Sequence, residues 1–102
     1  MPPFLAAADT REAAAAWLEW LGAERRASKH TLSAYASDLG QFFAFLTDHL
    51  GHPPALADLA GLRAADVRAW LARRQGQNYR ATSAARGLSA VRSFFRRLHR
   101  QG

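Results

Sequence analysis

Residues 28–51 read SKHTLSAYASDLGQFFAFLTDHLG, and this string predicts one long amphipathic helix. Its apolar side chains recur three or four positions apart, which places them on one face of an α-helix. Ser28 can cap the helix, because a serine oxygen accepts a hydrogen bond from a backbone N–H of the first turn. Gly51 follows the last leucine, where a glycine commonly ends a helix. The apolar stripe consists of Leu32, Tyr35, Leu39, Phe42, Phe43, Leu46 and Leu50.

Three more helices are predicted on either side of this one, over residues 10–25, 64–74 and 81–99, and no segment has the alternation typical of a strand. His52, Pro53 and Pro54 interrupt the chain, so residues 52–62 are expected to form a loop whose leucines reach the core. The fold class expected is all-α, a compact bundle of four helices. The domain boundaries expected are a flexible leader at 1–8, a helical domain at 9–100 and the start of a linker at 101–102.

The composition limits the kind of protein this can be. A chain of 102 residues corresponds to one domain, and it contains no cysteine for a disulfide or a thiolate metal site. No apolar run approaches the roughly 18–20 residues that span a bilayer, and the first residues lack the basic region of a signal peptide. We therefore expect a cytoplasmic protein without a membrane partner.

Charge is distributed unevenly along the chain. The last acidic residue is Asp66, and the 36 residues after it contain nine arginines. The first 66 residues contain eight acids and five basic residues. A one-sided positive field of this kind favours a polyanion, most often nucleic acid.

The sequence offers no set of groups for catalysis. The acids are scattered, there is no glycine-rich phosphate loop, and the four histidines (His30, His49, His52 and His99) lack the spacing of metal ligands. We expect no catalytic residue, no metal site and no cofactor in this chain.

Two surfaces suit DNA. The first is the start of the helix that begins after Ser28, because a helix N-terminus presents free N–H groups and a positive dipole end to phosphate. The second is the outer face of the last helix, where arginines can pair with phosphates or with guanine in a major groove. Arg92 and Arg96 flank this face on a helical wheel. The expected DNA-binding residues are Ser28, Lys29, His30, Thr31, Thr82, Ser83, Arg86, Ser89, Arg92, Ser93 and Arg97.

An arginine-rich helix face is also what a solvated surface looks like, and a different class of function stays open. The chain is then a helical protein-interaction module whose basic face meets an acidic partner. Trp20, Phe45 and Phe94 lie off the main apolar stripes and would be the anchors of that interface.

Three strings in order carry a resemblance to a known family. They are residues 17–46, which comprise Trp17, Leu18, Leu21, Glu24, Arg25, SKHTLSAYASDL at 28–39 and FFAFL at 42–46, then residues 66–71 (DVRAWL) and 83–95 (SAARGLSAVRSFF). Together they resemble the N-terminal core-binding domain of Xer-type tyrosine recombinases, of the phage integrase family. The resemblance implies a four-helix, SAM-like domain that clamps a recombination half-site. It also implies that the second and fourth helices lie at the major groove, on the surfaces chosen above by charge. The XerC branch is favoured over the XerD branch.

The resemblance also implies that this chain is one part of a larger enzyme and does not carry the catalytic activity itself. The parent would exchange DNA strands through a phosphotyrosyl intermediate, in DNA integration or the resolution of chromosome dimers at partition, with double-stranded DNA and partner recombinase protomers as its partners. Neither Tyr35 nor Tyr79 matches the nucleophile. The chain departs from the family at Arg63 and Arg80, where helix caps are usual, and at Gly87, where the family commonly has arginine and a phosphate contact is therefore expected to be lost.

Overall fold

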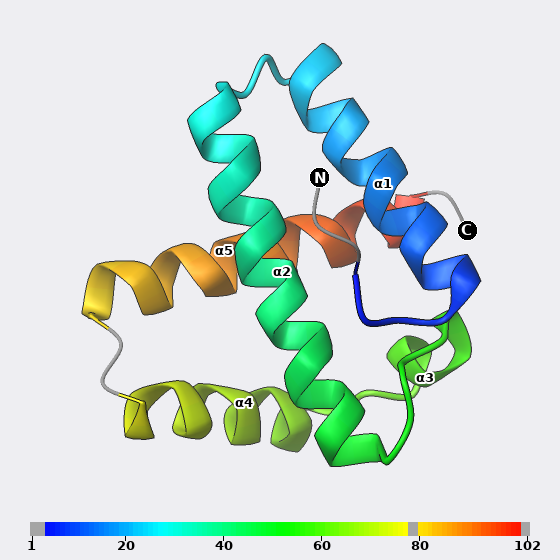
Figure 1. Ribbon diagram of the computed structural model, residues 1–102, viewed down its shortest axis with the longest axis vertical. Helices are drawn as coiled ribbons and strands as arrows, with labels where there is room; N and C mark the ends of the chain where they lie inside the picture. The colour runs from blue at the N-terminus through cyan, green and yellow to red at the C-terminus, as the bar shows by residue number, and fades with distance from the viewer. Residues whose placement is uncertain (1–3, 78–79, 101–102) are drawn as a thin grey trace.

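The long helix expected from residues 28–51 lies at the centre of the computed structural model, which describes residues 4–77 and 80–100 (Figure 1). The chain forms α1 (Ala8–Ala23), α2 (Lys29–Leu50), α3 (Leu56–Ala60), α4 (Ala64–Gly76) and α5 (Ala81–Arg100), with no strand in the described ranges. The all-α prediction is therefore confirmed. The expected linker start at 101–102 and Tyr79 lie outside the described residues.

Helix α2 begins and ends as its sequence predicts. The Ser28 side chain accepts a hydrogen bond from the backbone N–H of Thr31 at 3.1 Å. Gly51 closes the helix with a φ of 87°, a left-handed conformation that glycine adopts without the steric cost of a side chain. Helix α1 runs back alongside α2, and α5 crosses behind α2 in Figure 1. The start of α2 thus lies next to the end of α1, and α5 passes behind the middle of α2.

Aromatic side chains from four helices fill the core. Trp17 of α1 lies face to face with Tyr35 of α2 at 6.1 Å between ring centroids, and edge-on to Phe94 of α5 at 5.6 Å. Phe42 of α2 meets Trp70 of α4 edge-on at 4.9 Å. Both tryptophans and both of these phenylalanines are almost fully buried. Burial of such large rings, in the offset geometries that aromatic pairs prefer, fixes how the helices cross.

Two segments differ from the expectation. The predicted loop contains α3, a helix of five residues, too short to show a periodic pattern. The described part of the expected leader is not loose, because Phe4 is buried against Phe43 with ring centroids 5.6 Å apart. The backbone N–H of Ala7 also donates to the carbonyl of Pro54 at 3.0 Å. A single phenylalanine after two prolines forms no periodic apolar pattern, so the sequence does not predict that Phe4 is buried.

Helices α3 and α4 are capped by acids inside their first turns. Asp58 accepts a hydrogen bond from the N–H of Ala55, and Asp66 accepts one from the N–H of Arg63, both at 2.8 Å. Each bond satisfies the N–H of the residue that precedes the helix, as in one half of a capping box, although neither Ala55 nor Arg63 has a side-chain acceptor. His52 Nε2 also lies 3.1 Å from the Asp58 carboxylate, and His49 Nε2 lies 2.8 Å from the Asp66 carboxylate. Two hydrogen bonds lower the pKa of each aspartate below its ordinary value. The bond from the backbone N–H has the larger effect, and the bond from the histidine has the smaller one.

Candidate nucleic-acid interface

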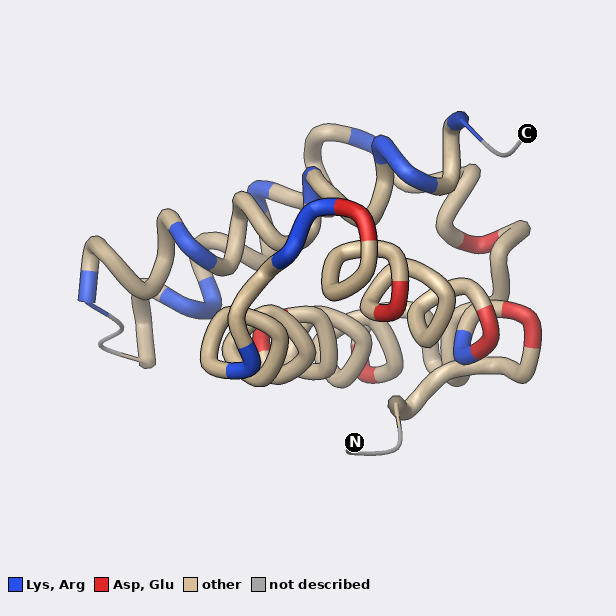
Figure 2. The backbone as a smooth tube through the Cα atoms, turned by 90° about the horizontal axis from the view of Figure 1, so that it is seen from above, with Lys and Arg blue, Asp and Glu red and all other residues tan. Residues whose placement is uncertain are grey.

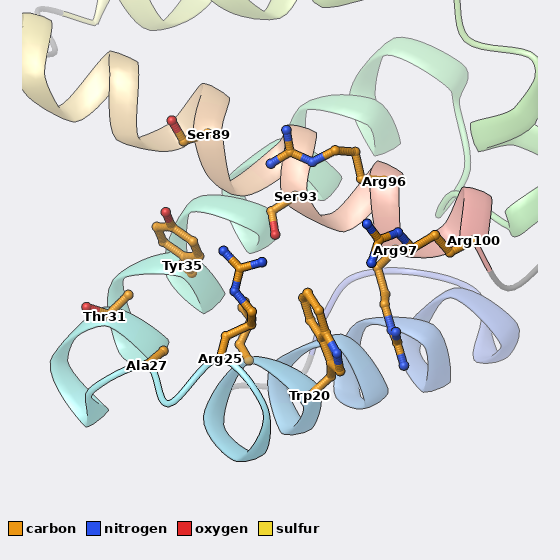
Figure 3. Close-up of a pocket in the computed structure, with 11 residues that line it drawn as sticks. Trp20, Arg25, Ala27, Thr31, Tyr35, Ser89, Ser93, Arg96, Arg97 and Arg100 are labelled. Carbon is orange, nitrogen blue, oxygen red and sulfur yellow. The ribbon is translucent and has the colours of Figure 1, made fainter.

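A groove of about 690 Å³ runs between the end of α1, the start of α2 and the outer side of α5 (Figure 3). No aspartate or glutamate is among the residues that line it. The charged and hydroxyl-bearing side chains along it are Arg25, Arg96, Arg97, Arg100, Thr31, Tyr35, Ser89 and Ser93. Such a lining offers hydrogen-bond donors and positive charge together, which is the chemistry that phosphate groups require.

The groove joins residues from both of the surfaces that the sequence singled out. Thr31 from the start of α2 faces Ser89, Ser93 and Arg97 from α5 across it. The remaining expected residues lie outside the groove lining. Ser28, Lys29 and His30 are exposed at the start of α2, Thr82, Arg86 and Arg92 are exposed on α5, and Ser83 is partly buried.

The outer face of α5 is turned slightly from the one expected on a helical wheel. Ser89, Arg92 and Arg96 are exposed, whereas Ser93 and Arg97 are partly buried against the rest of the fold. Arg92 and Arg96, which the wheel puts at the flank, therefore belong to the most exposed strip. Figure 2 shows basic positions following α5 along its length, and the helix contains no acid.

Some of the expected hydroxyl groups already have partners within the fold. The Ser93 hydroxyl accepts a hydrogen bond from the indole N–H of Trp17 at 3.1 Å. The Ser28 hydroxyl, besides capping α2, lies 3.0 Å from the Thr31 hydroxyl. A serine hydroxyl has further hydrogen-bonding capacity, so both groups can still bind a ligand. Their existing hydrogen bonds fix the orientation in which they do so.

Arg86 is held by a buried carboxylate on α2. Its Nε donates to one oxygen of Asp38 at 2.8 Å and its Nη2 donates to the other at 3.2 Å. The Asp38 side chain is 1% exposed, and the Arg86 side chain is 46% exposed. The hydrogen bonds and the negative charge of Asp38 raise the pKa of Arg86 above its ordinary value. The guanidinium is thus fixed on one edge and open to solvent on the other.

The same carboxylate lies near a second arginine, which is buried. Arg74 Nη2 is 3.9 Å from Asp38, Nη1 donates to the amide oxygen of Gln41 at 3.1 Å, and Nη2 donates to the carbonyl of Ser83 at 3.3 Å. A Cβ at Gly87 would lie 3.0 Å from Nη2 of Arg74. Gly87 therefore makes room for the Arg74 guanidinium. A lost phosphate contact was the expectation for Gly87, and this packing role gives the glycine a structural reason.

Several residues of the groove lining are not among the expected DNA-binding residues. Trp20, which the sequence suggested only as a protein anchor, lies in the last turn of α1, Arg25 follows α1, and Arg100 ends α5. The Cζ atom of Arg97 lies 4.7 Å from the centroid of the Trp20 ring, and that of Arg25 lies 5.7 Å from it. Residues 20 and 97 are too far apart in the chain for any local pattern to predict this contact.

The described ranges contain no cluster of three or more histidine and acidic side chains that could hold a metal ion. They also contain no helix with the length and apolar character needed to cross a bilayer.

Comparison with known proteins gives one family. Residues 14–102 match the family described as phage integrase, N-terminal SAM-like domain. The tyrosine recombinase XerC of Rhodospirillum centenum is 48% identical over 94 residues, which are 92% of this chain and 28% of the relative. The XerC of Brucella suis biovar 1 is 45% identical over 97 residues, which are 95% of this chain and 31% of the relative. The XerC of Methylobacterium nodulans is 46% identical over 103 residues, with coverage of 99% and 32%.

The chain spans about three tenths of the length of these curated relatives. No solved structure matches it. The family match extends from the first turns of α1 to the last residue and covers the helices that form the groove. The chain therefore belongs to the phage integrase N-terminal SAM-like domain family.

Proposed function

We propose that this chain is the DNA-binding N-terminal domain of a site-specific tyrosine recombinase of the XerC type, and that it clamps one half-site of the recombination DNA. The observation that carries this proposal is the acid-free groove, in which four arginines and four hydroxyl-bearing side chains from α2, α5 and the segment between α1 and α2 converge. The relatives named XerC support the class of parent protein.

The two helices of the interface have different tasks in this proposal. Helix α5 has 20 residues, so it is about 30 Å long, and it presents Ser89, Arg92 and Arg96 on its exposed strip. A helix of this kind enters the major groove of B-DNA, which is about 12 Å wide. The start of α2 meets the sugar–phosphate backbone beside it, with Lys29 and His30 as side-chain donors.

The chemistry of strand exchange belongs to the parent recombinase in this proposal. The domain described above supplies affinity, orientation and part of the sequence preference, and it works beside partner recombinase protomers on double-stranded DNA in the cytoplasm. No cofactor is required for this binding role.

A fluorescence anisotropy titration tests the proposal. The probe is a labelled duplex with a palindromic recombination site, at low salt. We expect the domain to bind it, and Arg96→Ala to weaken binding several-fold because Arg96 lines the groove. Arg68→Ala is the matched control, since Arg68 is an exposed arginine on α4 outside the groove lining. Equal weakening by both variants would mean that the overall positive charge, and not the groove, attracts the DNA. If the unaltered domain binds no duplex, the proposal is refuted.

The alternative of a protein-interaction module loses two of its three anchors. Phe45 is 7% exposed and Phe94 is fully buried, so the expectation that they are accessible was wrong for both. Phe45 packs beside His49, and Phe94 packs between Trp17 and Phe43. Trp20 alone of the three is only partly buried, and arginines lie over its ring.

A further inference from the structure

We infer that the end of α1 completes the interface with a subsite for one phosphodiester of the DNA backbone, formed by Trp20, Arg25 and Arg97. This inference rests on the proposed function and adds to it the end of α1 and the residues after it, none of which are among the DNA-binding residues expected from the sequence. We call these three residues the Trp20 cluster.

The Trp20 cluster holds two guanidinium groups around one indole. Arg97 Cζ lies over the ring at 4.7 Å from its centroid and Arg25 Cζ at 5.7 Å, within the range of a cation–π interaction. Figure 3 shows the two side chains on either side of the Trp20 ring, at the mouth of the groove. Contact with Trp20 thus orders two long cationic side chains before DNA binds. Less of their rotamer freedom is then lost on binding.

The fold leaves these cations without an anionic partner. Among the described residues the side chains of Arg25 and Arg97 make no hydrogen bond and no ion pair, and the Nε of Arg97 is buried without an acceptor. A buried donor without an acceptor is uncommon in folded proteins. Arg96 and Arg100 line the same groove, so an anion from outside would lower the repulsion among four like charges.

The position of the cluster identifies the anion as a backbone phosphodiester. The groove continues from Trp20 to Thr31 and Ser89, which lie on the two helices of the proposed DNA interface. A sugar–phosphate strand that follows this path meets the cluster next to the start of α2. A nucleobase stacked on Trp20 does not fit the geometry, because guanidinium groups already occupy the two sides of the ring.

Acrylamide quenching of tryptophan fluorescence tests whether the subsite is filled. Trp17 and Trp70 are at most 1% exposed, so Trp20 is the indole that quencher reaches. We expect a saturating duplex to protect this indole, and the change in quenching to disappear in Trp20→Phe, which lacks the partly exposed indole. Anisotropy on the same samples measures binding independently. A duplex that is fully bound while quenching of Trp20 is unchanged would overturn the subsite and leave the proposed function standing.

Neutral variants then count the phosphate contact. The double variant Arg25→Gln, Arg97→Gln should reduce the magnitude of the slope of log affinity against log salt by about 0.9, because the one phosphodiester then loses both of its cations, whereas Arg68→Gln should leave the slope unchanged. Circular dichroism checks that every variant is folded. Equal slopes in the double variant and in Arg68→Gln would overturn the subsite, and an unaltered domain that binds no duplex would overturn both proposals.

Discussion

Asp38 is the residue on which three helices depend. It accepts two hydrogen bonds from Arg86 of α5 and lies 3.9 Å from the buried Arg74 of α4. A buried charge is tolerated only when it is paired, because water no longer solvates it. The fold meets this requirement with one carboxylate between two guanidinium groups, and one of them, Arg86, reaches the surface where DNA is proposed to bind.

Asp38→Asn should therefore destabilise the domain more than its small change in shape suggests. The variant leaves Arg74 buried without a nearby negative charge, and we expect the free energy of unfolding to fall by about 2–3 kcal/mol in urea denaturation. Asp48→Asn is the control on the same helix, because Asp48 is 68% exposed and pairs with Arg73 at the surface. That variant should cost less than about 1 kcal/mol. Equal losses in the two variants would contradict the role given to Asp38.

Glycine-to-alanine substitutions in two helices should have opposite signs. At Gly87 a Cβ would lie 3.1 Å from Cζ of Arg74, so Arg74 must move away from Gln41 and Ser83, and we expect a loss of about 1–3 kcal/mol. At Gly40 the nearest atom is in Phe4 at an ordinary 3.9 Å, and there alanine should gain up to about 1 kcal/mol from its helix propensity. Thermal denaturation of both variants measures the signs. Stabilisation by Gly87→Ala would show that the Arg74 site yields easily.

At the scale of elements, local chemistry explains what the sequence predicts and what it does not. Helix α2 begins and ends as expected, because the Ser28 cap and the Gly51 terminus act within a few residues of the helix. Helix α3 was missed, because it has five residues and its cap, Asp58, lies inside it. The contact between Arg86 and Asp38 spans 48 residues, and nothing near either residue predicts it.

The starts of α3 and α4 should make the domain sensitive to acid. The pKa values of Asp58 and Asp66 are lowered in the fold, so these carboxylates stabilise it above their ordinary pKa, near pH 4, and this stabilisation is lost as the pH falls through the lowered values. We expect the melting temperature to decrease below about pH 4. The double variant Asp58→Asn, Asp66→Asn should flatten that decrease, whereas Asp48→Asn should not. An unchanged pH profile in the double variant would exclude these caps as its cause.

At the scale of the whole molecule, the uneven charge of the sequence places the arginines of the groove on a surface that no aspartate or glutamate lines. The acids after residue 50 cap helices at Asp58 and Asp66, and Asp38 is buried in an ion pair, so none of these three lines the groove. The groove arginines gather from both ends of the chain, since Arg25 lies in the more acidic first part and the other three in the basic last part. The charge count indicated the sign of the ligand, and only the fold brings Arg25 to the others.

This arrangement predicts a definite salt dependence for DNA binding. If Arg25 and Arg97 share one phosphate and Arg96 and Arg100 each neutralise another, the slope of log affinity against log salt is about −2.7. Between 50 and 200 mM salt the affinity for duplex DNA should then fall about 40-fold. Anisotropy titrations at four salt concentrations measure the slope directly. A much shallower slope would mean that the groove does not follow the backbone, because an interface that relied on apolar contacts would lose little affinity over the same range.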